Sequence, residues 1–246
     1  MSKRVLYQFP LSHYCEKTRW QLDVKQLPYS LRNLVPGPHR LQTRWRARSN
    51  TVPMLLDRGI AVSDSTRIAY HLEKHYPLPS LLPDSATQRT RVIELEQQFD
   101  RLGAHVRRWL YGQMLDRPEV MAAFYASYSL PSPAKAILQP LTRELIRRGY
   151  GLTPKRIAYS AQKMEEGFSA LEDIIANDAS AFLVGDRLTL ADIAGASLLA
   201  PVVAPPGSPW DFINRDDLPP ALRQELARLR DRPAGQWVLY QYQHNR

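Results

Sequence analysis

Cysteine is scarce in this chain, which has a single one, Cys15, among 246 residues. One thiol excludes an internal disulfide framework and a thiolate metal cluster, and it is typical of a protein in a reducing compartment. Long apolar runs are also lacking. None approaches the ~18 residues of a membrane span, and the first apolar run is far too short for the core of a signal peptide. We therefore expect a soluble, cytoplasmic protein.

Metal-binding patterns are lacking as well. The six histidines contain one helical pair, His71 and His75, whose four-residue spacing places two imidazoles on one face. No HExxH pattern or nearby set of acidic ligands completes this pair, so we expect no metal.

Acidic residues are outnumbered, and the net charge is +9. A positive field attracts nucleic acids, membranes and small anions alike. The arginines, however, are scattered among acidic and apolar residues along helical stretches, as at 107–108 and 147–148, and do not alternate with aromatic residues on one groove. We therefore expect a solvated basic surface that favours anionic substrates, with no nucleic acid and no membrane as partner.

The N-terminal part of the chain alternates short strand-like runs with helical stretches, which predicts an α/β layer. The turn signal Asp57-Arg58-Gly59 between two apolar runs predicts an antiparallel hairpin. The predicted strands are 5–9, 29–34, 52–57 and 60–62, and the predicted helices are 15–27, 38–47 and 65–76.

Three prolines between Pro77 and Pro83 interrupt any helix or central strand. We therefore predict a domain at 1–77, a linker at 78–85 and an all-helical domain at 86–246. Apolar residues at three- and four-residue spacing predict a long helix at 87–115 with a core-facing stripe. Further helices are predicted at 118–129, 133–149, 154–177, 190–203, 219–230 and 233–242.

The segment Ser12-His13-Tyr14-Cys15-Glu16-Lys17 joins the first strand to the first helix. The free N–H groups and positive end of a helix stabilise a thiolate there, and a serine hydroxyl donates one more hydrogen bond. Such a bond is worth ~1.5–3 kcal/mol, and one pKa unit needs about 1.4 kcal/mol. A bound thiol would therefore be mostly ionised at neutral pH. Ser12 is equally suited to be an ordinary N-cap.

Two further motifs are compatible with a peptide ligand. If the Val52–Pro53 bond is cis, which costs only ~0.5–1 kcal/mol before proline, the Val52 N–H and C=O turn outward and can pair with an extended peptide. An ordinary strand-initiating proline is the alternative. Ser65 is placed to cap the next helix and to receive a carboxylate, while Asp64 can bind an amine. Ser63-Asp64-Ser65 is also simply a good helix start.

In order and spacing, these motifs between Leu6 and Leu82 resemble the N-terminal domain of glutathione S-transferases. The group is the one with a serine or cysteine first-helix motif, which includes omega-like and glutaredoxin-like members. The resemblance implies an α/β plus all-α fold, with a thioredoxin-like N-terminal domain and an all-helical C-terminal domain. It also implies glutathione as co-substrate, a hydrophobic electrophile and a homodimer.

The resemblance further implies a role for each motif residue. Ser12 touches the glutathione sulfur and Tyr14 packs beside it. The remaining residues hold the tripeptide: Val52 with cis Pro53 at the cysteinyl main chain, Asp64 and Ser65 at the γ-glutamyl end, and His39 or Arg40 at the glycyl carboxylate. In the second half, Leu188 to Ile193 resembles the family's buried capping box, in which Thr189 and Asp192 bond to each other's backbone.

Some residues depart from the family pattern. Ser12 replaces the nucleophilic cysteine of thiol-transferase-like members, so a mixed disulfide is impossible there. Cys15, one turn further, is expected to be a buried apolar thiol, and Tyr7 is a second choice for activating the thiol. Residues 129–153 form a longer connection than usual, which could cover or reshape the electrophile pocket.

We therefore predict a detoxifying glutathione transferase, with Trp109, Tyr111 and Met114 as examples of helical residues that either contact the electrophile or belong to the core. Two competing hypotheses are a non-catalytic binding protein on the same fold and a glutathione-dependent oxidoreductase or peroxidase acting through Cys15.

Overall fold

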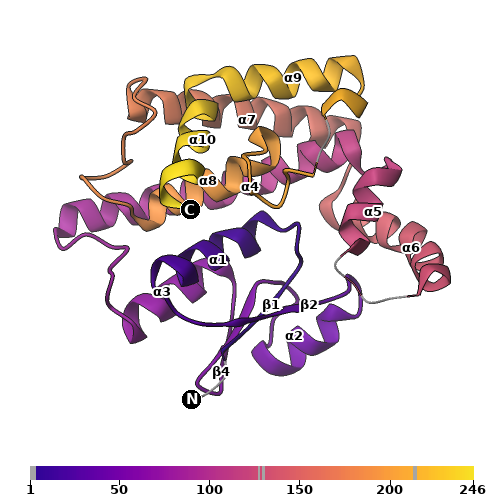
Figure 1. Cartoon of the computed structure of the whole chain (residues 1–246), viewed down its shortest axis with the longest axis horizontal. Coiled ribbons are helices and arrows are strands. Elements are labelled where there is room, and N and C mark those ends of the chain that lie inside the picture. The colour runs from indigo at the N-terminus through magenta and orange to yellow at the C-terminus, as the bar shows by residue number, and fades with distance from the viewer. Residues whose placement is uncertain (1–3, 127, 129–130, 213–214) are drawn as a thin grey trace. The chain divides into compact units, whose positions relative to one another are not determined.

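The structure is a computed structural model that describes residues 4–126, 128, 131–212 and 215–246 (Figure 1). It contains two compact units, each described here by itself. The first comprises Met1–Pro79 and Met114–Leu152, and the second comprises Ser80–Gln113 and Thr153–Arg246. In the described part of the chain, no helix combines the length and the apolar character needed to cross a bilayer.

The first unit is built on a four-stranded sheet with the order β2-β1-β3-β4. Strand β1 (Val5–Gln8) is parallel to β2 (Ser30–Asn33), and it is antiparallel to β3 (Met54–Asp57). Strand β4 (Ile60–Ser63) completes the predicted hairpin with β3. A parallel pair needs a crossover connection, and helix α1 (His13–Val24) provides it. The predicted α/β layer is confirmed.

Alternation along the strands separates two apolar layers. Leu6 and Leu55 pack on one face against α1 and α3 (Ser65–His75). Tyr7 and Met54 face the other way, toward α2 (His39–Ala47). Helices α1 and α3 therefore cover one face of the sheet and α2 covers the other, which fixes the ends of all three helices relative to the strand ends.

Helices α5 (Pro118–Ala126) and α6 (Ser132–Tyr150) belong to the same unit as the sheet. The Tyr128 hydroxyl donates a 2.7 Å hydrogen bond to the carbonyl of Leu34, just after β2. Gly37 lies so close to α6 that a Cβ there would be 3.4 Å from Leu145 Cδ1. The long connection predicted at 129–153 is thus mostly helix α6; residues 129 and 130 lie outside the described residues.

The second unit is helical in its described part. Its helices are α4 (Ala86–Met114, whose last residue is assigned to the first unit), α7 (Pro154–Ile175), α8 (Leu190–Val203), α9 (Pro220–Asp231) and α10 (Pro233–Asn245), with a short 3-10 turn at Arg215–Asp217. Every residue of α8 is buried, as expected of a central helix that is apolar on all sides. The predicted stripe of α4, including Val92, Phe99 and Val106, is buried too. The helical C-terminal region is therefore confirmed.

The start of α8 is fixed by the predicted capping box. One Asp192 carboxylate oxygen accepts hydrogen bonds from the N–H and the hydroxyl of Thr189, each 2.7 Å long. The other oxygen accepts a 2.7 Å bond from the N–H of Leu183. Asp192 is completely buried, and this burial raises the pKa of its carboxyl to about 6.

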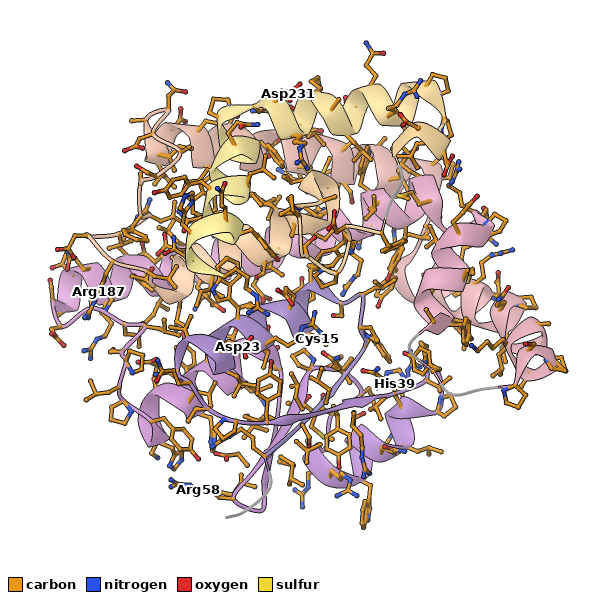
Figure 2. The ribbon with its side chains drawn as sticks, in the orientation of Figure 1. Cys15, Asp23, His39, Arg58, Arg187 and Asp231 are labelled. Carbon is orange, nitrogen blue, oxygen red and sulfur yellow. The ribbon has the colours of Figure 1, made fainter. Side chains whose placement is uncertain are left out.

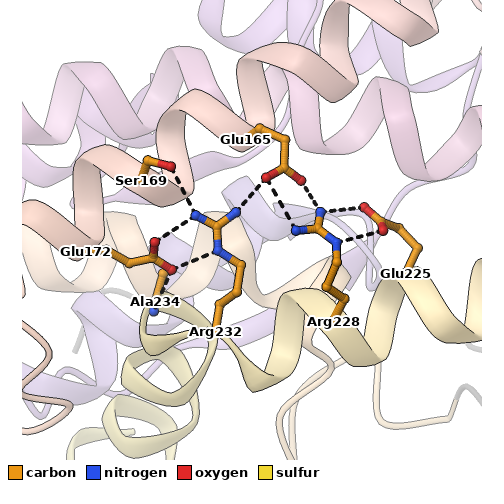
Figure 3. Close-up of polar contacts among 7 residues, drawn as sticks. All are labelled: Glu165, Ser169, Glu172, Glu225, Arg228, Arg232 and Ala234. Carbon is orange, nitrogen blue, oxygen red and sulfur yellow. Dashed lines mark hydrogen bonds and ion pairs between the residues drawn. The ribbon is translucent and has the colours of Figure 1, made fainter.

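An ion-pair network joins α7 to the junction of α9 and α10 (Figure 3). Arg232 contacts Glu165 at 2.6 Å and Glu172 at 2.7 Å. Arg228, one turn earlier, bridges Glu165 and Glu225. Because Arg232 also lies over the ring of Phe168, the junction is held by charge and by packing together.

Candidate active site

The N-terminus of α1 is organised by Ser12. Its backbone is extended, with φ −89° and ψ 119°, and its hydroxyl oxygen accepts the N–H of Cys15 at 3.4 Å. Ser12 is therefore the predicted N-cap. The same hydroxyl also hydrogen-bonds the Cys15 thiol, which lowers the pKa of that thiol against the larger, raising effect of burial. The ring of Tyr14, half-buried, lies tilted against that of His13 in the first turn, with 4.5 Å between the ring centroids.

The loop before β3 presents an unpaired backbone. The Val52–Pro53 peptide bond is cis, as predicted. The sheet ladder begins at Met54, and within the described residues neither the N–H nor the C=O of Val52 takes part in a backbone hydrogen bond. Val52 is only partly buried, so both groups are open to an extended peptide that pairs with them as an added strand.

The start of α3 differs from the prediction, because Asp64 and not Ser65 is the N-cap. One Asp64 carboxylate oxygen accepts the N–H groups of Thr66 and Arg67, each at 3.0 Å. The prediction of a Ser65 cap was wrong because the aspartate side chain of the preceding residue reaches both donors. Ser65 is instead the first helical residue, and its hydroxyl enters no hydrogen bond in the described part of the chain.

Asp64 also holds an unfavourable backbone conformation, with φ +86°. Non-glycine residues rarely adopt positive φ, and the surrounding structure must impose it. Here the two cap bonds and a 3.1 Å bond from the Asp64 N–H to the Pro53 carbonyl do so. Strain of this kind often accompanies functional sites, and it ties the start of α3 directly to the Val52–Pro53 loop.

Specific contacts bring these three segments together. The buried Lys17 of α1 donates a 3.3 Å hydrogen bond to the hydroxyl of Thr66 in α3. The ring of Phe9, after β1, packs edge-on against His39 at 4.8 Å. His39 in turn bonds to the carbonyl of Asn50 at 3.1 Å, two residues before Val52. The starts of α1 and α3 and the Val52 loop therefore adjoin within one compact unit.

Hydrogen bonds to the backbone distinguish His39 from Arg40, the two candidates for binding the glycyl carboxylate. The Gly37 N–H donates to His39 Nδ1 at 3.1 Å, so the ring proton lies on Nε2, which donates to Asn50. Burial lowers the pKa of His39, which favours this neutral form. Both ring nitrogens are thus engaged with backbone, whereas Arg40 is exposed on α2.

A cavity of about 390 Å³ adjoins Asp64. Its polar lining comes from the end of α2, the following loop, the end of β4 and the start of α3: Arg48, Ser49, Thr51, Ser63, Asp64 and Arg67. Two guanidinium groups and three hydroxyls among these side chains favour an anionic ligand. Sequence reasoning missed Arg48 and Arg67. Arg67 could have been predicted, because it follows the N-cap Asp64 by three residues. Arg48 could not, because the sequence does not indicate its left-handed conformation, with φ +51°.

Tyr7 and Cys15, the second and third candidates for thiol chemistry, lie in packed environments. Tyr7 is buried on the α2 face of the sheet, with the guanidinium groups of Arg32 and Arg46 near its ring. Cys15 lies inside α1 (Figure 2), and complete burial raises the pKa of its thiol. The raised pKa does not favour a reactive thiolate at Cys15.

The predicted histidine pair, His71 and His75, makes contacts within the first unit. The rings of His71 and His75 lie 4.5 Å apart, and His71 Nε2 bonds to Asp57 at 3.0 Å. Among the described residues, no group of three or more histidine, cysteine, aspartate or glutamate side chains is arranged to hold a metal ion.

Comparison with known families adds direct evidence for the N-terminal part of the chain. Residues 6–80 match the family model described as "Glutathione S-transferase, N-terminal domain". This segment is a glutathione S-transferase domain. The match contains all the predicted site residues, from Ser12 to Ser65, and ends in the proline-rich segment.

Similarity to known glutathione S-transferases and related enzymes extends over the whole chain. A probable maleylacetoacetate isomerase from Vibrio cholerae is 26% identical over 95% of this chain and 94% of its own length. Maleylacetoacetate isomerase from Rattus norvegicus is 24% identical over 82% of this chain and 77% of its own length. A glutathione S-transferase from Methylobacterium radiotolerans, solved with glutathione sulfonate, superposes with a TM-score of 0.60 at 22% identity, covering 97% of this chain and 95% of that one. The chain thus has the glutathione S-transferase fold throughout.

Proposed function

We propose that this chain is a glutathione transferase, which ionises the glutathione thiol and adds it to a hydrophobic electrophile. The observation that carries the proposal is the convergence of the α1 start, the Val52 backbone and the α3 start in one unit. A tripeptide with a thiol, an extended backbone and an amino-acid head needs these three elements. We also propose a homodimeric, cytoplasmic enzyme, with the sequence divided at 78–85.

Each part of glutathione has a proposed partner. Ser12 and the positive N-terminal end of α1 stabilise the thiolate, with Tyr14 beside them. Val52, next to Pro53, pairs with the cysteinyl backbone. Asp64 accepts the γ-glutamyl amine, and the Ser65 hydroxyl donates to its carboxylate. Arg40 is the candidate for the glycyl carboxylate, since His39 is already engaged. The arginines of the cavity next to Asp64 add to the positive field.

The test compares two N-cap variants. Ser12→Ala should lower the conjugation of a chloro-nitroaromatic by about ten-fold or more, because a charge-assisted bond to the thiolate is worth ~1.5–3 kcal/mol. Thr153→Ala removes an equivalent cap from α7, where the same 3.4 Å bond is made to Arg156, and should leave the rate unchanged. Isothermal titration with glutathione measures binding separately. Absent saturable binding, or equal rates for both variants, would refute the proposal.

A second candidate reaction is isomerisation, which the names of the two curated relatives favour. In such a reaction the thiolate adds to a conjugated C=C bond, the resulting single bond rotates and the thiolate leaves, so glutathione is regenerated. The same site serves both reactions. Monitoring maleylacetoacetate conversion together with free thiol separates them, because isomerisation turns over substrate without consuming glutathione, and conjugation consumes one thiol per product.

An oxidoreductase and a non-catalytic binding protein receive less support. An oxidoreductase acting through Cys15 needs a thiolate, whereas burial raises the pKa of this thiol. Disulfide and peroxide reduction, measured before and after alkylation of Cys15, tests this activity. A non-catalytic binding protein should tolerate changes at Ser12, Val52 and Ser65 without loss of function.

A further inference from the structure

A long stretch of the first unit carries charge of one sign only. No aspartate or glutamate occurs between Asp23 and Asp57, and six basic residues lie there: Lys25, Arg32, Arg40, Arg44, Arg46 and Arg48. Four of these six belong to α2 or follow it directly. Helix α2 is exposed over most of its surface, and only Thr43 in it is buried. The charge is therefore concentrated on one projecting helix.

Large apolar side chains lie among these arginines. Leu41 and Trp45, one turn apart on α2, are 76% and 79% exposed. They are neighbours on the helix surface, and the exposed Arg44 precedes Trp45 directly. Four residues before Leu41, Gly37 lies against Leu145 of α6.

Helix α6, in the same compact unit, carries a second row of exposed apolar side chains. Ile137, Leu141 and Leu145 follow at intervals of four residues, which places them on one face, and they are 74%, 57% and 41% exposed. These three residues, together with Leu41 and Trp45, are here called the α2–α6 face. Exposed apolar side chains in such a group mark an interaction surface.

We propose that the α2–α6 face binds the surface of a membrane rich in anionic lipids. Tryptophan and leucine enter the headgroup boundary while arginines on the same helix meet lipid phosphates, which is the composition of helices that lie in the membrane interface. The proposal reverses the expectation of a merely solvated basic surface. The exposed aliphatic residues favour lipid over nucleic acid, which binds through phosphate contacts and aromatic stacking. The protein lies on the membrane and does not span it.

Vesicle sedimentation of the full-length protein tests this proposal. Wild-type protein should bind phosphatidylglycerol-containing vesicles at least about ten-fold more tightly than phosphatidylcholine vesicles, and salt at about 0.5 M should weaken binding through screening. The double variant Leu41→Ser, Trp45→Ser should lose about ten-fold in affinity, because it removes the apolar part of the contact. Leu78→Ser is the matched control, since Leu78 is 80% exposed and lies outside the acid-free stretch.

Circular dichroism melts of the variants check that the fold is retained. Both positions on α2 are on the surface, so the melting temperature should not change, and Ile137→Ser offers an independent variant on α6. Equal binding to both vesicle types, or unchanged binding by the double variant, overturns the proposal. It is also overturned if the double variant instead loses duplex DNA binding or self-association, measured by fluorescence anisotropy and light scattering.

Discussion

Gly235, near the start of α10, should not tolerate alanine. A Cβ at this position would lie 2.3 Å from the carbonyl oxygen of Leu229 and 2.5 Å from that of Arg230, both in the last turn of α9. These atoms are backbone, so no side-chain rotation relieves the clash. The first turn of α10 would have to move, but the Arg232 ion pairs and the 2.8 Å bond from Trp237 to the Ala181 carbonyl hold it in place.

The magnitude follows from two opposing effects. Overpacking costs ~1–3 kcal/mol and sometimes more, and a contact with rigid backbone belongs at the upper end. Alanine returns about 1 kcal/mol of helix propensity. We expect Gly235→Ala to lower the free energy of unfolding by about 2–3 kcal/mol, and the melting temperature by roughly 5–10 °C for a chain of this size.

Urea denaturation followed by circular dichroism measures this change. Gly149→Ala is the control, because Gly149 lies exposed in helix α6 and a Cβ there meets nothing within 4 Å. That variant should be unchanged or up to about 1 kcal/mol more stable. If Gly235→Ala is as stable as the wild type, the close approach of α9 and α10 is not as described.

Two further predictions concern carboxylates. Burial raises the pKa of Asp192 from 3.8 to about 6. The contribution of Asp192 to stability is therefore greatest below pH 3.8 and falls as the pH rises through about 6. Urea titrations across this range should show that the difference in free energy of unfolding between wild type and Asp192→Asn falls in the same way, and a difference that does not change with pH contradicts the prediction. Asp64→Gly should relieve the strain of φ +86° and change the free energy of unfolding by less than about 1 kcal/mol. The same variant should bind glutathione roughly ten-fold more weakly by calorimetry, through loss of a charge-assisted bond; unchanged affinity removes Asp64 from the site.

Much of the secondary structure was predictable because its signals are local. Helix α8 was predicted at 190–203 and has those bounds, since a capping box begins it and an alanine-proline segment follows it. The order of the strands was not predictable from the apolar pattern, because that pattern is the same for parallel and antiparallel pairs. The grouping of α5 and α6 with the sheet depends on contacts such as Tyr128 to Leu34, which are 94 residues apart.

The candidate site was predictable in its segments and less so in its details. Ser12 and Val52 lie where the motifs placed them, because a helix start and an X-Pro bond are local features. The sequence could not decide whether Asp64 or Ser65 caps α3, since both residue types cap helices well. Arg48 enters the cavity only through the fold of α2 toward β4, for which no spacing rule exists.

The bond between Tyr128 and Leu34 has a practical consequence for anyone dividing this protein. A fragment that stops at the proline-rich segment contains the sheet but lacks α5 and α6, which belong to the same compact unit. Its Leu34 carbonyl loses its donor, and the apolar surface beside Gly37 loses Leu145. We therefore expect a fragment that carries only the thioredoxin-like sheet to be less stable than one that also includes residues 114–152.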